Sequence, residues 1–186
     1  MNIERFPEPI DALIIKNTFS EVERNNIENE IKSFKREQGD GVWISDVYKD
    51  LEMSPVNRNM LETFFGPDVF ETMVNMNSLY GIYGHVNNHS TIVRYYGDGQ
   101  SSVIHYDAAA FTIKTFLFDQ PKGFTGGNVT LQVGGDIAYE SDIENNMSII
   151  FPSSYYVSLS DVSITDKSIK DSGLFVITTY LFIESH

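Results

Sequence analysis

The second half of the chain is a series of short β-rich segments separated by turn residues, and this pattern constrains the fold more than any other feature. From about residue 91 onward, runs rich in Val, Ile, Phe, Tyr and Thr recur at short intervals, and Gly or Asn residues punctuate them. About eight strands are expected, at residues 92–96, 103–106, 111–118, 129–133, 137–139, 148–151, 155–159 and 174–183. Short strands at such spacing predict an antiparallel sandwich or jelly roll.

The first half of the chain has a mainly helical pattern. Ser20 and Glu23 form a capping box at the start of a helix expected to run to about Arg36, and a short buried strand is expected before it, at residues 12–15. A second helical region begins near Ser54, breaks at residues 66–67 and then resumes. These helices are expected to cover the sheet.

The length is compatible with one domain. The chain has 186 residues, and its hydrophobic content of 41% is ample for a packed core. We predict a single domain over residues 1–186, of the α+β class and mostly β, with residues 1–85 as a helical support region and residues 86–186 as the jelly-roll core.

Charge and composition restrict the partners and the chemistry. The formal net charge of −13 opposes binding to nucleic-acid phosphates or to anionic lipid, so neither nucleic acid nor membrane is expected as a partner. There is no cysteine, which excludes disulfides and thiolate metal sites and leaves His, Asp and Glu as strong metal ligands. Without a secretion signal or a long apolar stretch, a cytoplasmic protein is predicted.

His105 and Asp107 lie two residues apart on a segment expected to be extended. Side chains at this spacing project from the same face of a strand, where they can bind one metal ion together. The sequence also allows a simpler interpretation, in which His105 is a hydrogen-bonded core histidine and Asp107 caps the turn before Ala108.

The order of these elements resembles the prolyl-4-hydroxylase-like branch of the Fe(II)/2-oxoglutarate-dependent oxygenases. The resemblance extends from about residue 91 to residue 182, and it rests on Tyr95-x-Gly97-x-Gly99, His105-x-Asp107, and the segments 112–117, 126–131 and 149–153. It implies a double-stranded β-helix with N-terminal helices, Fe(II) and 2-oxoglutarate as cofactors, and hydroxylation of a peptide or small molecule. By this resemblance, His105 and Asp107 are two of three iron ligands, and Tyr95 hydrogen-bonds the cosubstrate.

The third iron ligand of that family, a histidine, is missing from the expected segment. Ser160 falls in the corresponding register, and a neutral hydroxyl is a poor substitute for imidazole at a divalent metal. Asp161 is the first candidate for the third metal ligand because it is close to the expected location. His85 and His89 are a second possibility, although their surroundings predict a polar connection.

The arginine that binds the distal carboxylate of 2-oxoglutarate in that family is also missing, with Leu174 near its expected position. Lys114 could replace it, because some relatives bind the cosubstrate through a lysine of the same strand and a buried ammonium needs an anionic partner. The alternative is that Lys114 extends into water from the outer face.

Two functions are therefore open. The first is an Fe(II)/2-oxoglutarate-dependent dioxygenase with an incomplete set of iron ligands. The second is a non-catalytic jelly-roll protein, descended from such an enzyme, that binds a ligand or partner.

Overall fold

The computed structural model describes residues 1–6, 11–34, 37–39, 42–46, 54–168 and 171–184. Its helices are α1 (Glu21–Ser33), α2 (Pro55–Phe64), α3 (Pro67–Val74) and the 3₁₀ helix η2 (Tyr80–His85). Its strands are β1 (Asn2–Phe6), β2 (Ala12–Lys16), β3 (Glu37–Gly39), β4 (Val42–Asp46), β5 (Asn88–Tyr96), β6 (Gln100–His105), β7 (Phe111–Leu117), β8 (Phe124–Gly126), β9 (Val129–Val133), β10 (Asp136–Ser141), β11 (Met147–Pro152), β12 (Tyr156–Ile164) and β13 (Leu174–Phe182).

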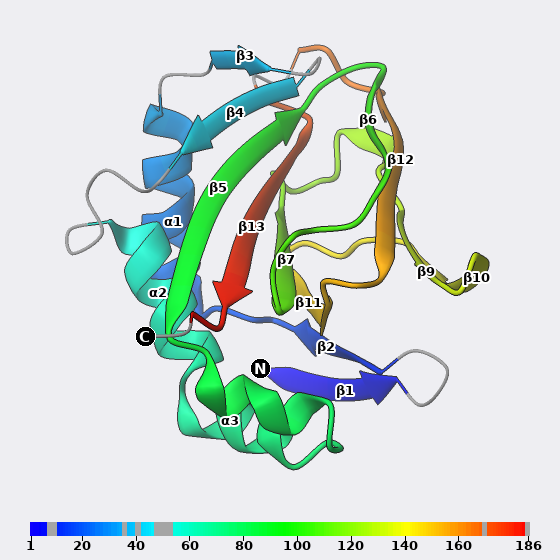
Figure 1. Ribbon diagram of the computed structural model, residues 1–186. Helices are drawn as coiled ribbons and strands as arrows, with labels where there is room; N and C mark the ends of the chain where they lie inside the picture. Colours follow the sequence, from blue (N-terminus) through cyan, green and yellow to red (C-terminus); the bar gives the residue numbers. More distant parts are fainter. Residues whose placement is uncertain (7–10, 35–36, 40–41, 47–53, 169–170, 185–186) are drawn as a thin grey trace.

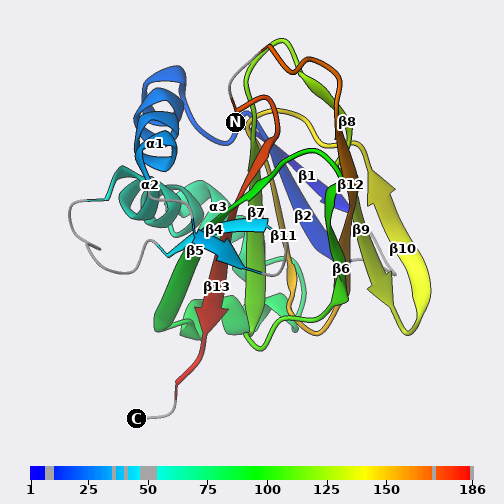
Figure 2. The ribbon, with the colours of Figure 1, turned by 90° about the horizontal axis from the view of Figure 1, so that it is seen from above.

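The elements form three layers, with helices against one face of a large sheet and a smaller sheet against the other (Figures 1 and 2). The large sheet has the order β1-β2-β11-β7-β13-β5-β4-β3, and the small sheet has the order β10-β9-β12-β6 with β8 paired to β12. All the strand pairs described are antiparallel. This arrangement confirms the predicted double-stranded β-helix with helices packed on it.

The predicted helix boundaries follow from local chemistry. Ser20 accepts a hydrogen bond from the Glu23 amide, and Glu23 accepts one from the Ser20 amide at 2.7 Å, so the capping box is present. Ser54 caps α2, and the break at Gly66 separates α2 from α3 as expected. The first helix is shorter than expected: α1 ends at Ser33 and Phe34 is already extended, whereas the helix was expected to run to about Arg36, which lies outside the described residues.

The first 85 residues supply strands as well as helices. β2 forms where a buried strand was expected, and it pairs with β11, while β4 pairs with β5. The large sheet therefore draws strands from both sides of residue 85. No helix in the described residues is long and apolar enough to cross a lipid bilayer.

β7 divides two hydrophobic clusters because successive side chains of a strand point to opposite faces. Phe111, Ile113 and Leu117 belong to the cluster beneath the helices, and Phe116 belongs to the cluster between the two sheets. Lys114 has the same parity as Phe116, so its side chain enters the space between the sheets. The outward-facing alternative for Lys114 is wrong.

The backbone between β8 and β9 passes very close to β12. Gly126 has a φ of +73°, and a Cβ atom added there would lie 2.0 Å from the Asp161 carbonyl oxygen. Only glycine satisfies both requirements, since a positive φ and a missing side chain are needed together.

Replacing Gly126 with Ala is expected to lower the free energy of unfolding by more than about 2 kcal/mol. The strain of a positive φ and the steric clash of the new Cβ with the Asp161 carbonyl oxygen both contribute to this loss. Gly134→Ala is the matched control: its φ is +63° and nothing lies within 4 Å of the added Cβ. The control should lose only about 1 kcal/mol. Urea unfolding measures both values, and equal losses would contradict the importance of the close approach.

Candidate binding site

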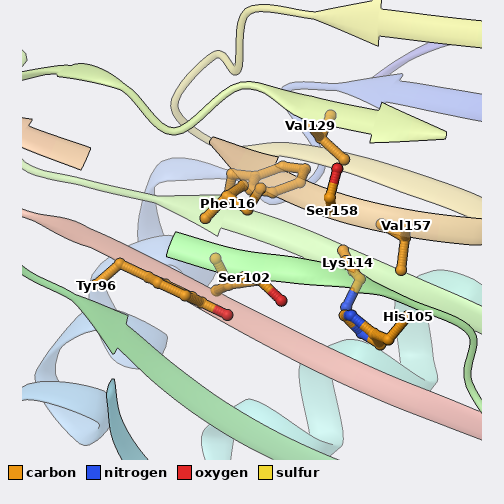
Figure 3. Close-up of a pocket in the computed structure, with 10 residues that line it drawn as sticks. Tyr96, Ser102, His105, Lys114, Phe116, Val129, Val157 and Ser158 are labelled. Carbon is orange, nitrogen blue, oxygen red and sulfur yellow. The ribbon is translucent and has the colours of Figure 1, made fainter. Parts of the chain in front are cut away.

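A small cavity lies between the two sheets, and it contains two of the predicted site residues, His105 and Lys114 (Figure 3). The space open to the centre of a water-sized sphere is about 10 Å³, enough for about one water molecule. Its lining is mostly apolar and consists of Tyr96, Ser102, His105, Lys114, Phe116, Val129, Val157, Ser158, Leu159 and Val176.

His105 and Asp107 come together at one end of the cavity, where His105 Nε2 lies 3.6 Å from Asp107 Oδ1. The Asp107 side chain is only 6% exposed, and its other oxygen accepts a hydrogen bond from Thr112 Oγ1 at 2.9 Å. Thr112 in turn lies 2.8 Å from Ser153 Oγ. The turn after β6 therefore holds the carboxylate in a fixed position.

The orientation of the His105 ring restricts its tautomer. Nδ1 lies 2.8 Å from the Val103 carbonyl oxygen, which can only accept, so Nδ1 carries a hydrogen. In the neutral ring Nε2 then presents a lone pair to the Asp107 carboxylate. Two acceptors facing each other need a proton or a cation between them.

Val157 is the residue of β12 directly opposite His105. It is paired with His105 across β6 and β12, lines the cavity and is 1% exposed. An isopropyl group has no ligating atom. Among the described residues, no group of three or more His, Asp or Glu side chains could bind a metal ion together.

The candidates for the third ligand lie elsewhere. Ser160 and Asp161 are exposed on β12, and Ser160 Oγ accepts a hydrogen bond from the Asn128 amide instead. Asp161 is therefore not brought to the His105–Asp107 pair, because two irregularities in the β6–β12 register shift the faces between Val157 and Val162.

His85 and His89 are not brought to the pair either. His85 ends η2, and His89 belongs to β5, where a polar connection was expected. By strand alternation, His89 shares the helix-facing side with Val93. It therefore lies on the opposite face of the large sheet from the cavity.

Lys114 is the main charged group inside the barrel. It is 7% exposed, and in Figure 3 its amine projects toward the His105 ring. Burial lowers its pKa from 10.5 to about 8, the Asp107 carboxylate opposes that shift, and the Arg94 cation adds to it. No hydrogen bond or ion pair holds the amine within the part of the chain that the structure describes.

Two further polar atoms on this face of the sheet have no hydrogen-bond partner among the described residues. Thr178 is paired with Lys114 across β7 and β13, and its buried Oγ1 has no hydrogen-bond partner. Arg94 Nε is also buried without one. Buried polar groups are normally hydrogen-bonded, so these two groups have free capacity to hydrogen-bond a ligand or water. Val176 lines the cavity and Leu174 is buried, so the expected arginine is replaced by apolar residues.

Tyr95 is on the wrong side of the sheet for the predicted cosubstrate contact. Its ring packs on Phe175 with a centroid distance of 4.8 Å, and its hydroxyl accepts a hydrogen bond from the Gly173 amide. Tyr96, which sequence reasoning missed, lines the cavity instead. Adjacent residues of a strand face opposite ways, so one of the two tyrosines had to point inward, but only the register of β5 shows which one.

The residues present do not fit the complete iron and 2-oxoglutarate site of the oxygenases. His105 and Asp107 supply two donors, and Val157 stands where a third is needed. Lys114 and Thr178 are suitable partners for a carboxylate, but a space for about one water is too small for a whole 2-oxoglutarate molecule.

Comparison with known proteins supports the fold. Searches against protein-family models and against curated proteins find no match. Among solved structures, a 2OG-Fe(II) oxygenase family oxidoreductase from Burkholderia pseudomallei has a TM-score of 0.68 at 10% identity, covering 93% of this chain and 84% of that one. A prolyl hydroxylase from Trichoplax adhaerens, solved with a hypoxia inducible factor peptide, has a TM-score of 0.65 at 14% identity, with coverages of 92% and 83%.

A prolyl-4-hydroxylase from Pseudomonas putida is also similar, with a TM-score of 0.58 at 10% identity over 95% of both chains. The predicted resemblance to the prolyl-hydroxylase-like oxygenases is confirmed at the level of the fold. At these identities the likeness does not extend to activity.

Lys114→Met is expected to raise the free energy of unfolding at pH 7 by about 1–3 kcal/mol, because it removes the cost of burying a charge. Between pH 8 and 10.5 the unfolded wild type binds more protons than the folded one, so its stability should rise with pH. The variant should lack this rise. Urea unfolding at several pH values measures it, and parallel pH profiles would contradict the buried charge.

Val157→His is expected to increase Mn²⁺ affinity at least about tenfold over the wild type, because it adds an imidazole beside His105. Isothermal titration measures the affinities. Val157→Phe is the control of similar shape without a donor atom. A gain that Val157→Phe shares, or that survives His105→Ala, would show that Val157 does not occupy the third position.

Proposed function

We propose that this protein is a non-catalytic binding protein built on the oxygenase fold, and that Lys114 binds the carboxylate group of a small molecule in the barrel. The observation that carries the proposal is the buried amine of Lys114, 7% exposed at the cavity and held by no ion pair in the described residues.

A bound carboxylate would compensate the free-energy cost of burying the Lys114 amine without an ion pair. An isolated buried charge is unfavourable unless it is paired and hydrogen-bonded. One carboxylate could accept hydrogen bonds from both Lys114 Nζ and the orphaned Thr178 Oγ1, which project from paired positions of adjacent strands. Arg94 adds positive charge on the same face of the sheet.

The size of the cavity restricts how such a ligand enters. Only a group of a few atoms can reach Lys114, so the rest of the ligand must extend toward the opening beside His105. The His105 side chain is 30% exposed, and its rotation away from Val103 would widen the passage.

A second candidate is an Fe(II)- and 2-oxoglutarate-dependent hydroxylase acting on a peptide or small molecule. The observation that favours it is the pair of acceptors formed by His105 Nε2 and Asp107 Oδ1, 3.6 Å apart, because such a pair attracts a cation. The valine at position 157 weighs against it. Iron would supply the oxidising chemistry in such an enzyme, and His105 and Asp107 would be its ligands from this chain.

Carboxylate binding is tested by isothermal titration with acetate, succinate and 2-oxoglutarate at pH 7. We expect saturable binding by at least one of them, weakened at least tenfold in Lys114→Met and weakened in the wild type as the pH rises above about 8, where the amine loses its charge. Lys122→Met, outside the cavity, is the charge-matched control. Binding that is equal in the wild type and Lys114→Met would remove Lys114 from the site.

Catalysis is tested by measuring succinate production from 2-oxoglutarate with Fe(II), ascorbate and oxygen. The proposal expects no succinate above a protein-free control. Turnover that disappears in His105→Ala and in Asp107→Ala would overturn the non-catalytic assignment and establish the second candidate.

A further inference from the structure

β6 is the edge strand of the small sheet. Within the described residues its one neighbouring strand is β12, and that pairing is interrupted by two register irregularities. An edge strand presents unpaired backbone N–H and C=O groups, which are a template for another extended chain.

The surface beside this edge is unusually apolar. Val103 is 81% exposed, and Ile104, Tyr106 and Tyr156 are also exposed. The rings of Tyr106 and Tyr156 meet edge to face, with centroids 5.8 Å apart. These four residues, called the β6 patch below, lie on β6, at the residue after it and at the start of β12. Exposed apolar groups that gather in this way mark interaction surfaces.

β6 lacks the charged residues that other edges of this protein carry, although its register irregularities are themselves a form of edge protection. Proteins protect free strand edges with charged residues or proline. The opposite edge of the same sheet, β10, carries Asp136 and Glu140, and the edge strand β1 carries Glu4 and Arg5. β6 has the sequence QSSVIH, without Lys, Arg, Asp, Glu or Pro.

The net charge of the protein indicates which kind of chain can bind at the β6 edge. Two copies of a chain with a formal net charge of −13 repel each other, which opposes edge-to-edge pairing of β6 with itself. Asp161 is exposed on neighbouring β12, whereas Asp98, in the turn before β6, is already paired with Lys167 at 3.0 Å. A positively charged segment is therefore favoured.

We propose that the β6 edge binds an extended, basic segment of a partner polypeptide by strand addition. The partner backbone pairs with the outer edge of β6, alternate apolar side chains of the segment pack on the β6 patch, and its Lys or Arg residues face Asp161. The interaction uses the outer edge of the small sheet and does not involve the amine of Lys114, although β6 also contributes His105 to the cavity.

The test uses a fluorescein-labelled peptide of alternating valine and lysine, eight or more residues long, and fluorescence anisotropy with the full chain. We expect saturable binding that is weakened at least tenfold when alternate peptide amides are N-methylated, because methylation removes the donors that strand pairing needs. The same peptide with glutamate in place of lysine should bind at least tenfold more weakly. No binding of the lysine peptide, or unchanged binding after methylation, would overturn the proposal.

Val103→Lys should weaken binding of the lysine peptide at least tenfold, because it places a cation in the middle of the β6 patch. Val103 is highly exposed, so folding should be retained, and circular dichroism checks this; Ile104→Lys is the second variant. Val22→Lys, on α1 and 70% exposed, is the matched control for the added charge. Equal weakening by Val22→Lys would overturn strand addition in favour of a general charge effect. Light scattering that shows a dimer lost in Val103→Lys would instead assign the edge to a second copy of the chain.

Discussion

The burial of β7 on both faces is the constraint on which the rest of the structure depends. All seven of its residues are buried, and it is hydrogen-bonded to β11 on one side and to β13 on the other. One face packs beneath the helices, where Thr115 Oγ1 lies 2.7 Å from Ser148 Oγ and 3.8 Å from Met60 Sδ. The other face closes the cavity. A one-residue slip of β7 would exchange the two faces and remove Lys114 from the barrel.

The same strand connects the core to the candidate site. Thr112 precedes Lys114 by two residues on the cavity side of β7, and its hydroxyl donates to Asp107. Asp107 is therefore positioned by the register of β7 with β11, which also brings Ser153 to Thr112. A hydrogen bond from β7 therefore positions the carboxylate.

Much of the fold could be predicted from the sequence because its signals are local. The capping box at Ser20, the helix break at Gly66 and the alternating strands after residue 91 each depend on neighbours within a few residues. The site was less predictable, because the face of a strand residue depends on pairing with distant strands. Tyr95 was assigned to the cosubstrate although Tyr96 lines the cavity, and the register irregularities of β12 turn Asp161 outward.

The hydrogen bonding of His105 is compatible with metal binding, although no third ligand joins it among the described residues. A metal-bound imidazole uses one nitrogen for the metal and the other for a hydrogen bond that fixes the ring. His105 keeps that second bond, from Nδ1 to the Val103 carbonyl, and its Nε2 still faces Asp107. Val157 contributes volume and apolar surface at the place where a third donor would complete the site.

The two ends of the cavity differ in the charge that they favour. The His105–Asp107 end favours a cation, whereas Lys114, 7% exposed and without an ion pair in the described residues, favours an anion. Because the cavity between them has room for about one water-sized group, a cation at one end and a carboxylate at the other compete for the same space unless the carboxylate also coordinates the cation.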